Sequence, residues 1–450
     1  MKWTELLSEE RLGDSAYRAP PGRPAAVQDY DRIVFSEPFR RLANKTQVHP
    51  LYHHDHIHHR LIHSIEVASV GRSLSMGIGA RLVARGELPP GGEYALSNVV
   101  QAACVAHDIG NPPFGHSGEE SIGNWFGERF AQGRGLFGDL DPALQQQFID
   151  FEGNAQGFRI LTRLEMYRGR GGMRLSKAVL GAFSKYPVTA ATRAALPEAT
   201  RKSYAGLKKF GVFAAEAAYF AEAAEALGLP REGLPHAPWW RRHPLVLVVE
   251  AADDICYNIV DLEDGFTTGD LRYDEVRVPL EALIGGDPKP RREGQSEAEH
   301  VATLRAVAIG QALEACTQAF DSHYDAIMAG SFSDALIDAS DRAAEFAAIK
   351  DLARSRLFTS PRKTELEVSG RRIVQNVMSG VWPVYEALAA AGWQAEGLPG
   401  PMQQLCRALD LDLREVTDAE SALHGLADFT SGMTDRYALR IAQMLSGTGS

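Results

Sequence analysis

The sequence is poor in cysteine. Four cysteines occur in 450 residues, far apart, and no two of them form a CxxC pair. This spacing excludes a zinc ribbon and gives no basis for a disulfide framework. We expect them to be small buried hydrophobic residues in a reducing cytosol. They are Cys104, Cys256, Cys316 and Cys406.

Long apolar segments are also lacking. No apolar run approaches the length of about 18 residues that suggests a transmembrane helix. The first residues, MKWTELLSEERLGD, lack the apolar core of a signal peptide. We therefore expect a soluble, cytoplasmic protein that has no contact with a membrane.

An excess of basic residues is absent as well. The chain has 47 Lys and Arg against 58 Asp and Glu, so its formal net charge is −11. This balance argues against a general nucleic-acid coat, but it leaves room for a local cationic pocket for an anionic substrate. The phosphate-binding pattern GxxxxGK[ST] is missing, so a triphosphate would have to be held in another way.

The sequence does contain helical patterns over most of its length, and 45% of its residues are hydrophobic. Apolar residues recur at helical intervals, whereas sustained alternation typical of strands is absent. The predicted class is therefore mainly α. The predicted helices cover residues 63–86, 97–110 (with Ser97 as N-cap), 214–228, 244–265, 298–328, 334–356, 372–391 and 418–446.

Glycine- and proline-rich stretches predict loops at 132–142, 167–174 and 285–297. The last is the best candidate for a boundary. We expect a core with an N-terminal arm over residues 1–280. A C-terminal helical region over residues 298–450 would pack on this core in one continuous globular unit.

A chemical motif lies in AHDIGNPPFGHSGEE, residues 106–120. The adjacent His107 and Asp108 stand where an apolar helix gives way to a loop, so both side chains could reach one divalent ion. A single His-Asp pair more often has a structural role, so the hypothesis needs partners from other helices.

Asp253 is one such partner. In EAADDICYNIVDLED, Asp253, Tyr257 and Asp261 fall at intervals of four on one helical face. A solvated acidic stripe accounts for Asp261, Glu263 and Asp264. It does not account for Asp253, because the preceding LVLVVEAA is typical of a buried segment, where a carboxylate needs a counter-charge such as a metal.

The third partner comes from HPLYHHDHIHHRLIHS, residues 49–64, which holds seven of the fourteen histidines. His63 begins an amphipathic stretch whose apolar face includes Ile65 and Ala68, so we expect its ring near the core. His59 is the competitor, because histidines four residues apart can chelate one ion. The pattern favours His63.

These four residues, His63, His107, Asp108 and Asp253, resemble the H…HD…D signature of the HD phosphohydrolase superfamily. Longer words resemble the deoxyguanosine triphosphate triphosphohydrolase family, and they run in order from Phe39 to Leu439. These words are FRRLANKTQVHPL, DHIHHRLIHSIEVASVGRSL, HDIGNPPFGHSGE, FEGNAQGFRIL, KYP, EAADDICYNIVDLED and DFTSGMTDRYAL.

The resemblance implies an HD-domain helical fold with additional C-terminal helices. It also implies hydrolysis of a deoxynucleoside triphosphate, dGTP or several dNTPs, to a deoxynucleoside and inorganic triphosphate. The four signature residues would hold one divalent ion. Imidazole and carboxylate ligands suit Mn, Fe, Co, Ni or Zn better than Mg.

The resemblance also assigns roles around the ion. His116 and Glu119 match the family's catalytic histidine and acid. His116 would transfer a proton, either to the 5′-oxygen as an acid or from water as a base. A structural role, capping the helix after the Pro-Pro turn, is the alternative.

Several other residues match substrate-binding positions of the family or stand where they could contact the substrate. Arg60 and Lys185 are expected at the phosphates, with Lys208 or Lys209 as a third cation, Gln47 at the sugar, and Tyr257 and Asp261 at the sugar or base. The extra residues His53, His54, His58 and His59 depart from the family pattern. The word GMTDRYAL belongs to the resemblance, but its residues predict no role beyond packing.

Two other functions remain open. One is another HD-type nucleotidase or phosphodiesterase. The other is a regulator that binds a nucleotide or single-stranded DNA and has a weak site. The resemblance further implies a homo-oligomer, and single-stranded DNA remains a candidate partner.

Overall fold

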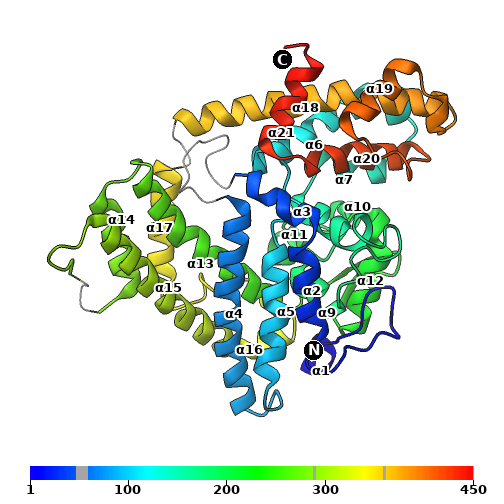
Figure 1. Ribbon diagram of the computed structural model, residues 1–450. Coiled ribbons are helices and arrows are strands. Elements are labelled where there is room, and N and C mark those ends of the chain that lie inside the picture. The colour runs from blue at the N-terminus through cyan, green and yellow to red at the C-terminus, as the bar shows by residue number, and fades with distance from the viewer. Residues whose placement is uncertain (47–58, 287–289, 358–360, 449–450) are drawn as a thin grey trace.

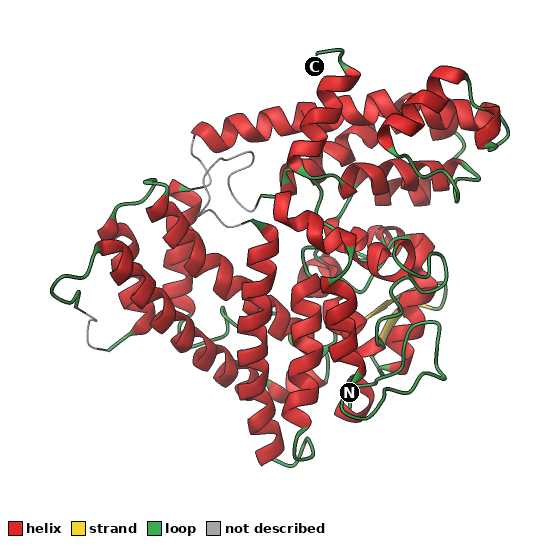
Figure 2. Ribbon diagram, viewed as in Figure 1, coloured by secondary structure: helices red, strands yellow, loops and turns green. Residues whose placement is uncertain are grey.

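The computed structural model describes residues 1–46, 59–286, 290–357 and 361–448. Almost all regular structure in these residues is helical (Figure 2). The sheet that they contain is a small antiparallel hairpin of β1 (Arg231–Leu234) and β2 (Ala237–Trp240). The prediction of a mainly α protein is confirmed.

Three long helices form the centre of the molecule. They are α4 (Arg60–Ala84), α5 (Gly92–Ala106) and α13 (Pro244–Thr267), and α4 packs against both of the others (Figure 1). Gly71 of α4 permits this close approach, because a methyl group there would lie 2.5 Å from the Cys104 sulfur and 3.4 Å from Ala252. α13 begins where the His243 side chain accepts the Leu245 amide and Pro244 occupies the first turn.

Further helices complete a first hydrophobic core on both sides of these three. On one side, α14, α15 and α17 pack together and against α13; on the other, α2 and α9 pack against α5, and α12 packs on α9 (Figure 1). The helices that contribute to this core, including the short α1 and α16, have the following bounds: α1 (Trp3–Leu6), α2 (Ala25–Val34), α9 (Lys177–Phe183), α12 (Ala217–Ala226), α14 (Tyr273–Ile284), α15 (Glu297–Ser322), α16 (Tyr324–Met328) and α17 (Ala343–Arg356).

A second hydrophobic core includes residues of the helices at the top of the view in Figure 1. Its aromatic centre includes Trp125 and Phe148 from the middle of the chain and Trp382 from the C-terminal part. Its helices are α6 (Gly115–Gln132), α7 (Pro142–Ile149), α18 (Pro361–Ala390), α19 (Gly400–Leu409), α20 (Ala419–Gly432) and α21 (Asp435–Leu445). Other helices of the described residues are shorter: α3 (Glu37–Arg41), α8 (Gly153–Arg159), α10 (Ala190–Ala195) and α11 (Glu198–Ser203).

Several predicted helix bounds are wrong. The helix predicted from Ser97 begins at Gly92, because Gly91 adopts a left-handed conformation there (φ 85°), and Ser97 lies buried inside α5. The helix predicted from residue 334 begins at Ala343. In the turns before it, the Ser340 hydroxyl donates to the Ile337 carbonyl and accepts the Arg342 amide, which competes with helical bonding.

Two predicted helices are each divided in two. The predicted helix 298–328 is interrupted at His323, between α15 and α16. The predicted helix 418–446 is interrupted at Met433, which is extended (ψ 155°) and precedes the N-cap Thr434 of α21. The predicted helix 372–391 belongs to α18, which begins earlier, at Pro361.

The predicted loops are found in the described residues, with one short 3₁₀ turn at Gly135–Phe137. The division at residues 285–297 stays a prediction, and each hydrophobic core draws helices from both sides of it. Three cysteines are buried as expected, whereas Cys406 is half-buried. Within the described residues, no helix is both long and apolar enough to cross a membrane.

Candidate active site

Three central helices bring the four predicted metal ligands together. His63 lies in the first turn of α4, His107 and Asp108 follow the end of α5, and Asp253 lies in α13. One ligand atom from each of His63, His107 and Asp108 lies within 4.8 Å of the other two. The Asp253 Oδ1 atom lies 3.0 Å from His63 Nε2 and 3.6 Å from His107 Nε2.

The neighbouring groups orient these ligands. His107 Nδ1 lies 2.7 Å from the Cys104 carbonyl, which can only accept, so Nδ1 carries the proton and Nε2 is left for an ion. The Asn111 side-chain amide donates to Asp108 Oδ1, and the Arg60 guanidinium donates to Asp108 Oδ2 over 2.8 Å. Both oxygens of Asp108 are therefore held in place.

The donor set fits a divalent metal. Ligand atoms that bind one ion at about 2.1 Å, and at right angles, lie about 3 Å apart, which is close to the separations around Asp253. Two imidazole nitrogens with two carboxylates suit Mn, Fe, Co, Ni or Zn. His63 and Asp108 are buried, and the Asp253 side chain is 31% exposed because it faces a cavity. These residues could hold a metal ion.

The electrostatics keep both carboxylates ionised. Burial alone would raise the pKa of Asp253, but His107 and His63 lower it well below its usual range. Burial likewise opposes ionisation of Asp108, and the Arg60 guanidinium outweighs it and lowers the pKa. Two carboxylates that are anionic at neutral pH supply the negative charge that a divalent cation requires.

A cavity of about 290 Å³ opens beside this group. His107, Asp108 and Asp253 form one part of its wall. The rest of the wall includes Arg60, Asn111, His116, Glu119, Asn154, Lys185, Tyr186, Lys209 and Glu250. The lining therefore combines possible metal ligands, a histidine–carboxylate pair and several cations.

The pair of His116 and Glu119 lies one turn apart at the start of α6. His116 Nδ1 is 2.9 Å from Glu119 Oε2, and the other oxygen of Glu119 accepts the Gly153 amide over 2.7 Å. This bond to Glu119 raises the pKa of His116. The His116 side chain is 84% exposed. The helix start at Phe114 has no side-chain cap, so the capping alternative does not account for these contacts.

The expected phosphate-binding cations are each paired with a carboxylate. Arg60 is buried against Asp108, Lys185 Nζ lies 3.6 Å from Glu250, and Lys209 Nζ lies 2.6 Å from Glu152. Lys208 lines a neighbouring cavity of about 390 Å³ and not this one. Lys209 is thus the better placed of the two candidates.

Each of these two pairs contains a group whose pKa is raised. Burial alone would lower the pKa of Lys185, but the Glu250 carboxylate raises it. Burial, and then the nearby Glu119 charge, raise the pKa of Glu152 to about 7. Lys185 is therefore cationic at neutral pH.

Other predicted residues lie farther from the cavity or outside the described chain. Tyr257 and Asp261 follow Asp253 on α13, but neither is part of the cavity lining given above. The interpretation of Asp261 and Asp264 as a solvated stripe is wrong: both side chains are buried. Gln47, His53, His54, His56 and His58 lie outside the described residues.

Comparison with known proteins bears on this arrangement. Residues 60–140 match the HD domain, and residues 339–444 match the phosphohydrolase-associated domain. The chain is 40% identical, over the full length of both proteins, to a deoxyguanosinetriphosphate triphosphohydrolase-like protein of Pseudomonas aeruginosa. It is 37% identical to one of Synechocystis sp. over 99% of both chains.

A third relative carries the unqualified name. The chain is 31% identical to a deoxyguanosinetriphosphate triphosphohydrolase of Salmonella arizonae, over 83% of this chain and 80% of that protein. The chain belongs to the deoxyguanosinetriphosphate triphosphohydrolase family. This phosphohydrolase is therefore a hydrolase that acts on phosphoric ester bonds. The resemblance found in the sequence words is confirmed, and so is the HD-domain helical fold.

The structure shows three further residues that contact candidate site residues of the phosphohydrolase and that are not predicted from the sequence. Asn111 orients Asp108, Glu250 pairs with Lys185, and Glu152 pairs with Lys209. Two signals were present: Asn111 follows the HD pair by one turn, and Glu250 precedes Asp253 by three residues in a helix. Glu152 gave no comparable signal.

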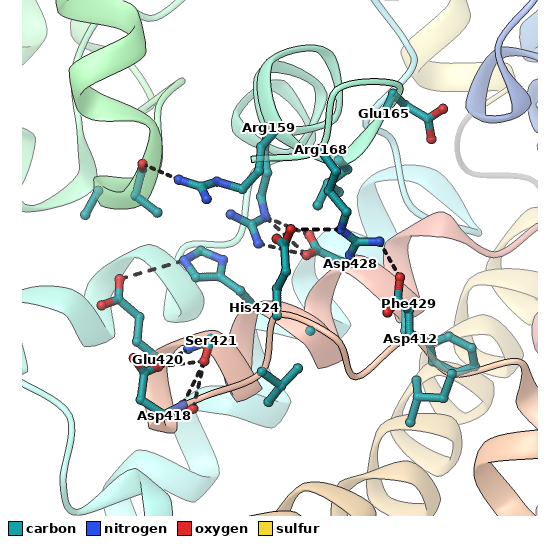
Figure 3. A pocket seen from close by; sticks show the side chains of 18 of the residues that line it. Arg159, Glu165, Arg168, Asp412, Asp418, Glu420, Ser421, His424, Asp428 and Phe429 are labelled. Atoms are coloured by element: carbon teal, nitrogen blue, oxygen red, sulfur yellow. Dashed lines mark hydrogen bonds and ion pairs between the residues drawn. The ribbon is translucent and has the colours of Figure 1, made fainter. Parts of the chain in front are cut away.

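The phosphohydrolase also has a larger cavity of about 530 Å³, shown in Figure 3. It lies between residues 159–168 and the region of α20, and it shares no lining residue with the cavity at the histidines. Its main charges pair with each other, Arg159 with Asp428 and Arg168 with Asp412 (Figure 3). We assign the chemistry to the smaller cavity, because only that one contains the candidate ligands.

Proposed function

We propose that the phosphohydrolase cleaves a deoxynucleoside triphosphate, dGTP or several dNTPs, to a deoxynucleoside and inorganic triphosphate. One observation carries the proposal. The His107, Asp108 and Asp253 ligands, the His116–Glu119 pair and the cations Lys185 and Lys209 line a single cavity.

His63, His107, Asp108 and Asp253 would hold one divalent ion. When bound, such an ion polarises a phosphate oxygen and lowers the pKa of coordinated water. Asn111 and the Cys104 carbonyl fix two of the ligands, so the set needs little rearrangement.

Cleavage on the sugar side of the α-phosphorus has a poor leaving group, the 5′-alkoxide, which needs a proton. His116 is the group proposed to transfer a proton, to the 5′-oxygen as an acid or from water as a base. Glu119 accepts from Nδ1, which leaves Nε2 of the exposed ring available toward a substrate. The raised pKa keeps a larger fraction of His116 protonated near neutral pH.

The triphosphate carries several negative charges, and this chain's own cations would neutralise them. Lys185 and Lys209 are proposed at the phosphates as point charges, and Arg60 is proposed beside the α-phosphate. Their carboxylate partners hold these side chains in place before a substrate binds. A preformed arrangement lowers the entropy cost of binding.

Tyr257, Asp261 and Gln47 are proposed at the sugar and base. A tyrosine ring under the deoxyribose would clash with a 2′-hydroxyl, which gives a preference for deoxynucleotides. A homo-oligomer, binding of single-stranded DNA, the cytoplasmic location and the identity of the ion stay predictions.

The proposal is tested by comparing the hydrolysis rates of substrates that carry three, two or one phosphates. We expect the purified protein with Mn to hydrolyse dGTP or another dNTP much faster than dGDP, dGMP or bis(p-nitrophenyl) phosphate. EDTA and the variant His107→Ala should both abolish the reaction. Faster hydrolysis of the diester or the monophosphate would contradict the proposal in favour of another HD-type activity.

A further inference from the structure

The C-terminal word GMTDRYAL contains a buried carboxylate that contacts the active-site loop. Asp435 is the first residue of α21 and is 1% exposed. Its Oδ1 accepts the Phe114 amide over 3.0 Å, and its Oδ2 accepts the Thr46 amide and hydroxyl over 3.1 and 2.6 Å. One side chain thus joins three segments that are far apart in sequence.

Phe114 stands at a strained position of the backbone. It is left-handed (φ 62°), and so is Gly115 after it (φ 57°). A bulky residue in this conformation costs about 1 kcal/mol or more, and it persists only where its surroundings hold it. The bond from its amide to Asp435 is such a constraint.

This turn decides where the catalytic pair lies. α6 begins at Gly115, so His116 and Glu119 take their direction from the two left-handed residues. A Cβ at Gly115 would lie 2.7 Å from the Arg60 guanidinium, so the turn packs directly against the group that holds Asp108. A small shift of the turn would move the proposed proton donor relative to the metal ligands.

A second buried side chain ties the same parts together. Lys45 is 3% exposed, and its Nζ donates to the Asn111 carbonyl over 2.6 Å and to the Ser431 carbonyl over 2.8 Å. Asn111 in turn donates to Asp108. Lys45 therefore connects Ser431, at the end of α20, with the loop that follows His107 and Asp108. Ser431 precedes Asp435 by four residues.

The same region joins the start of α4. Thr46 pairs with His59 in an antiparallel bridge, and the Arg60 amide donates to the Lys45 carbonyl over 3.0 Å. His63 is one turn further along α4. The contacts of Asp435 with Thr46 thus also reach the helix that supplies the first ligand.

We propose that Asp435 is a positioning residue: the C-terminal helix α21 holds the Phe114–Gly115 turn, and through it His116, in register with the metal ligands. This inference rests on the proposed function for its effect on catalysis. A role limited to capping α21 does not account for these bonds, since Thr434 already accepts the Tyr437 amide at that helix end.

The test compares Asp435→Asn with the matched control Thr434→Ala. The asparagine keeps the size of the side chain, but it replaces one acceptor oxygen by an NH₂ donor. In one orientation this donor faces the Phe114 amide, and the bond to the turn is lost. In the other it faces Thr46, and the Phe114 amide keeps only a neutral acceptor, which forms a weaker bond than a carboxylate. Thr434→Ala weakens the start of the same helix, but it leaves the bonds of Asp435 to Phe114 and Thr46 in place.

Hydrogen exchange measured by mass spectrometry gives a readout that needs no activity. In a peptide over residues 111–115, Asn111 carries the free amine and Pro112 and Pro113 have no amide hydrogen, so the peptide reports on the Phe114 and Gly115 amides alone. We expect slow exchange at Phe114 in the wild type, faster exchange in Asp435→Asn, and little change in Thr434→Ala.

Kinetics of the metal-loaded enzyme give the second readout. Asp435→Asn should lower kcat for the preferred dNTP by roughly 10- to 100-fold, the range expected when a catalytic group is displaced by up to about 1 Å. Its KM and metal content should stay near those of the wild type, and Thr434→Ala should keep its kcat.

Three results would overturn the inference: fast exchange at Phe114 in the wild type, unchanged exchange in Asp435→Asn, or faster exchange with an unchanged kcat. The first needs no variant, so it decides the matter even if Asp435→Asn does not fold. A wild type without metal-dependent hydrolysis would contradict the proposed function instead. The exchange result would still show whether Asp435 holds the turn.

Discussion

His59 and His63 stand one turn apart at the start of α4, but their surroundings differ. The His59 ring nitrogen accepts the Ile62 amide over 3.4 Å as the N-cap of the helix. His63 is 4% exposed, and its Nε2 points to Asp253. The surroundings of His59 favour a structural role, and those of His63 favour a role as a metal ligand.

We therefore predict that His63→Ala loses bound metal and activity, whereas His59→Ala keeps both. Elemental analysis of the purified variants after incubation with Mn measures the metal, and hydrolysis of a dNTP measures the activity. Equal loss of metal in both variants would show that His59 is a ligand as well.

The raised pKa of His116 gives a prediction for pH dependence. The bond to the Glu119 carboxylate stabilises the protonated imidazole, so Glu119→Gln should lower the pKa of His116 toward its ordinary value of about 6.5. The limb of the kcat profile that reports His116 should then move to lower pH. This direction holds for both proposed roles: activity falls along that limb with rising pH if His116 is an acid, and rises if it is a base.

His116→Ala is the control for that profile. It should remove the limb and lower kcat by roughly 10² to 10⁴, the range for a positioned acid or base. Its metal content and melting temperature should stay near those of the wild type. If the profile does not move in Glu119→Gln, or moves to higher pH, this limb does not report the ionisation of His116 beside Glu119.

At the scale of the elements, an ion pair between the buried Arg159 and the half-buried Asp428 connects α8 with α20. The Arg159 guanidinium donates to both oxygens of Asp428 over 2.9 Å and also to Glu216 over 2.7 Å. Gln156 donates to the same Asp428. Removing one partner of such a network leaves a charge buried without compensation.

We predict that Asp428→Ala lowers the free energy of unfolding by about 3 kcal/mol. Asp412→Ala, which breaks half-exposed pairs with Arg168 and Arg414 at the edge of the same cavity, should cost about 1 kcal/mol or less. Urea denaturation of both variants measures the difference. Equal effects would show that burial of the Asp428 pair adds nothing.

The sequence predicts helices best where local signals and packing agree. α13 was predicted from its opening proline and its apolar run, and both features form the start of the observed helix. The bounds of α5 and α17 were wrong because a left-handed Gly91 and the side-chain bonds of Ser340 set the actual starts. Neither constraint follows from hydrophobic periodicity.

In the candidate site, too, residues with local signals are predictable from the sequence and residues that depend on distant contacts are not. His63, His107, Asp108 and Asp253 were predicted because helix ends and buried faces restrict where such side chains can point. Asp435 and Lys45 were not, since their role depends on contacts across more than 300 and 60 residues respectively. A single sequence contains no signal for contacts of that separation.

At the scale of the whole molecule, the candidate active site lies where the two hydrophobic cores meet. The candidate ligands come from helices of the first core, and His116 and Glu119 come from α6, which packs with α18 in the second. The relative position of the cores therefore sets the distance between the proposed metal and the proposed proton donor. The C-terminal helices are part of the catalytic framework in this account.

In the proposed reaction, hydrolysis releases the intact triphosphate from the sugar. The most direct measurement is product identification after incubation of the purified protein with each dNTP and Mn. We predict deoxynucleoside and intact inorganic triphosphate in equal amounts, with His107→Ala inactive. Deoxynucleoside monophosphate with pyrophosphate would contradict it.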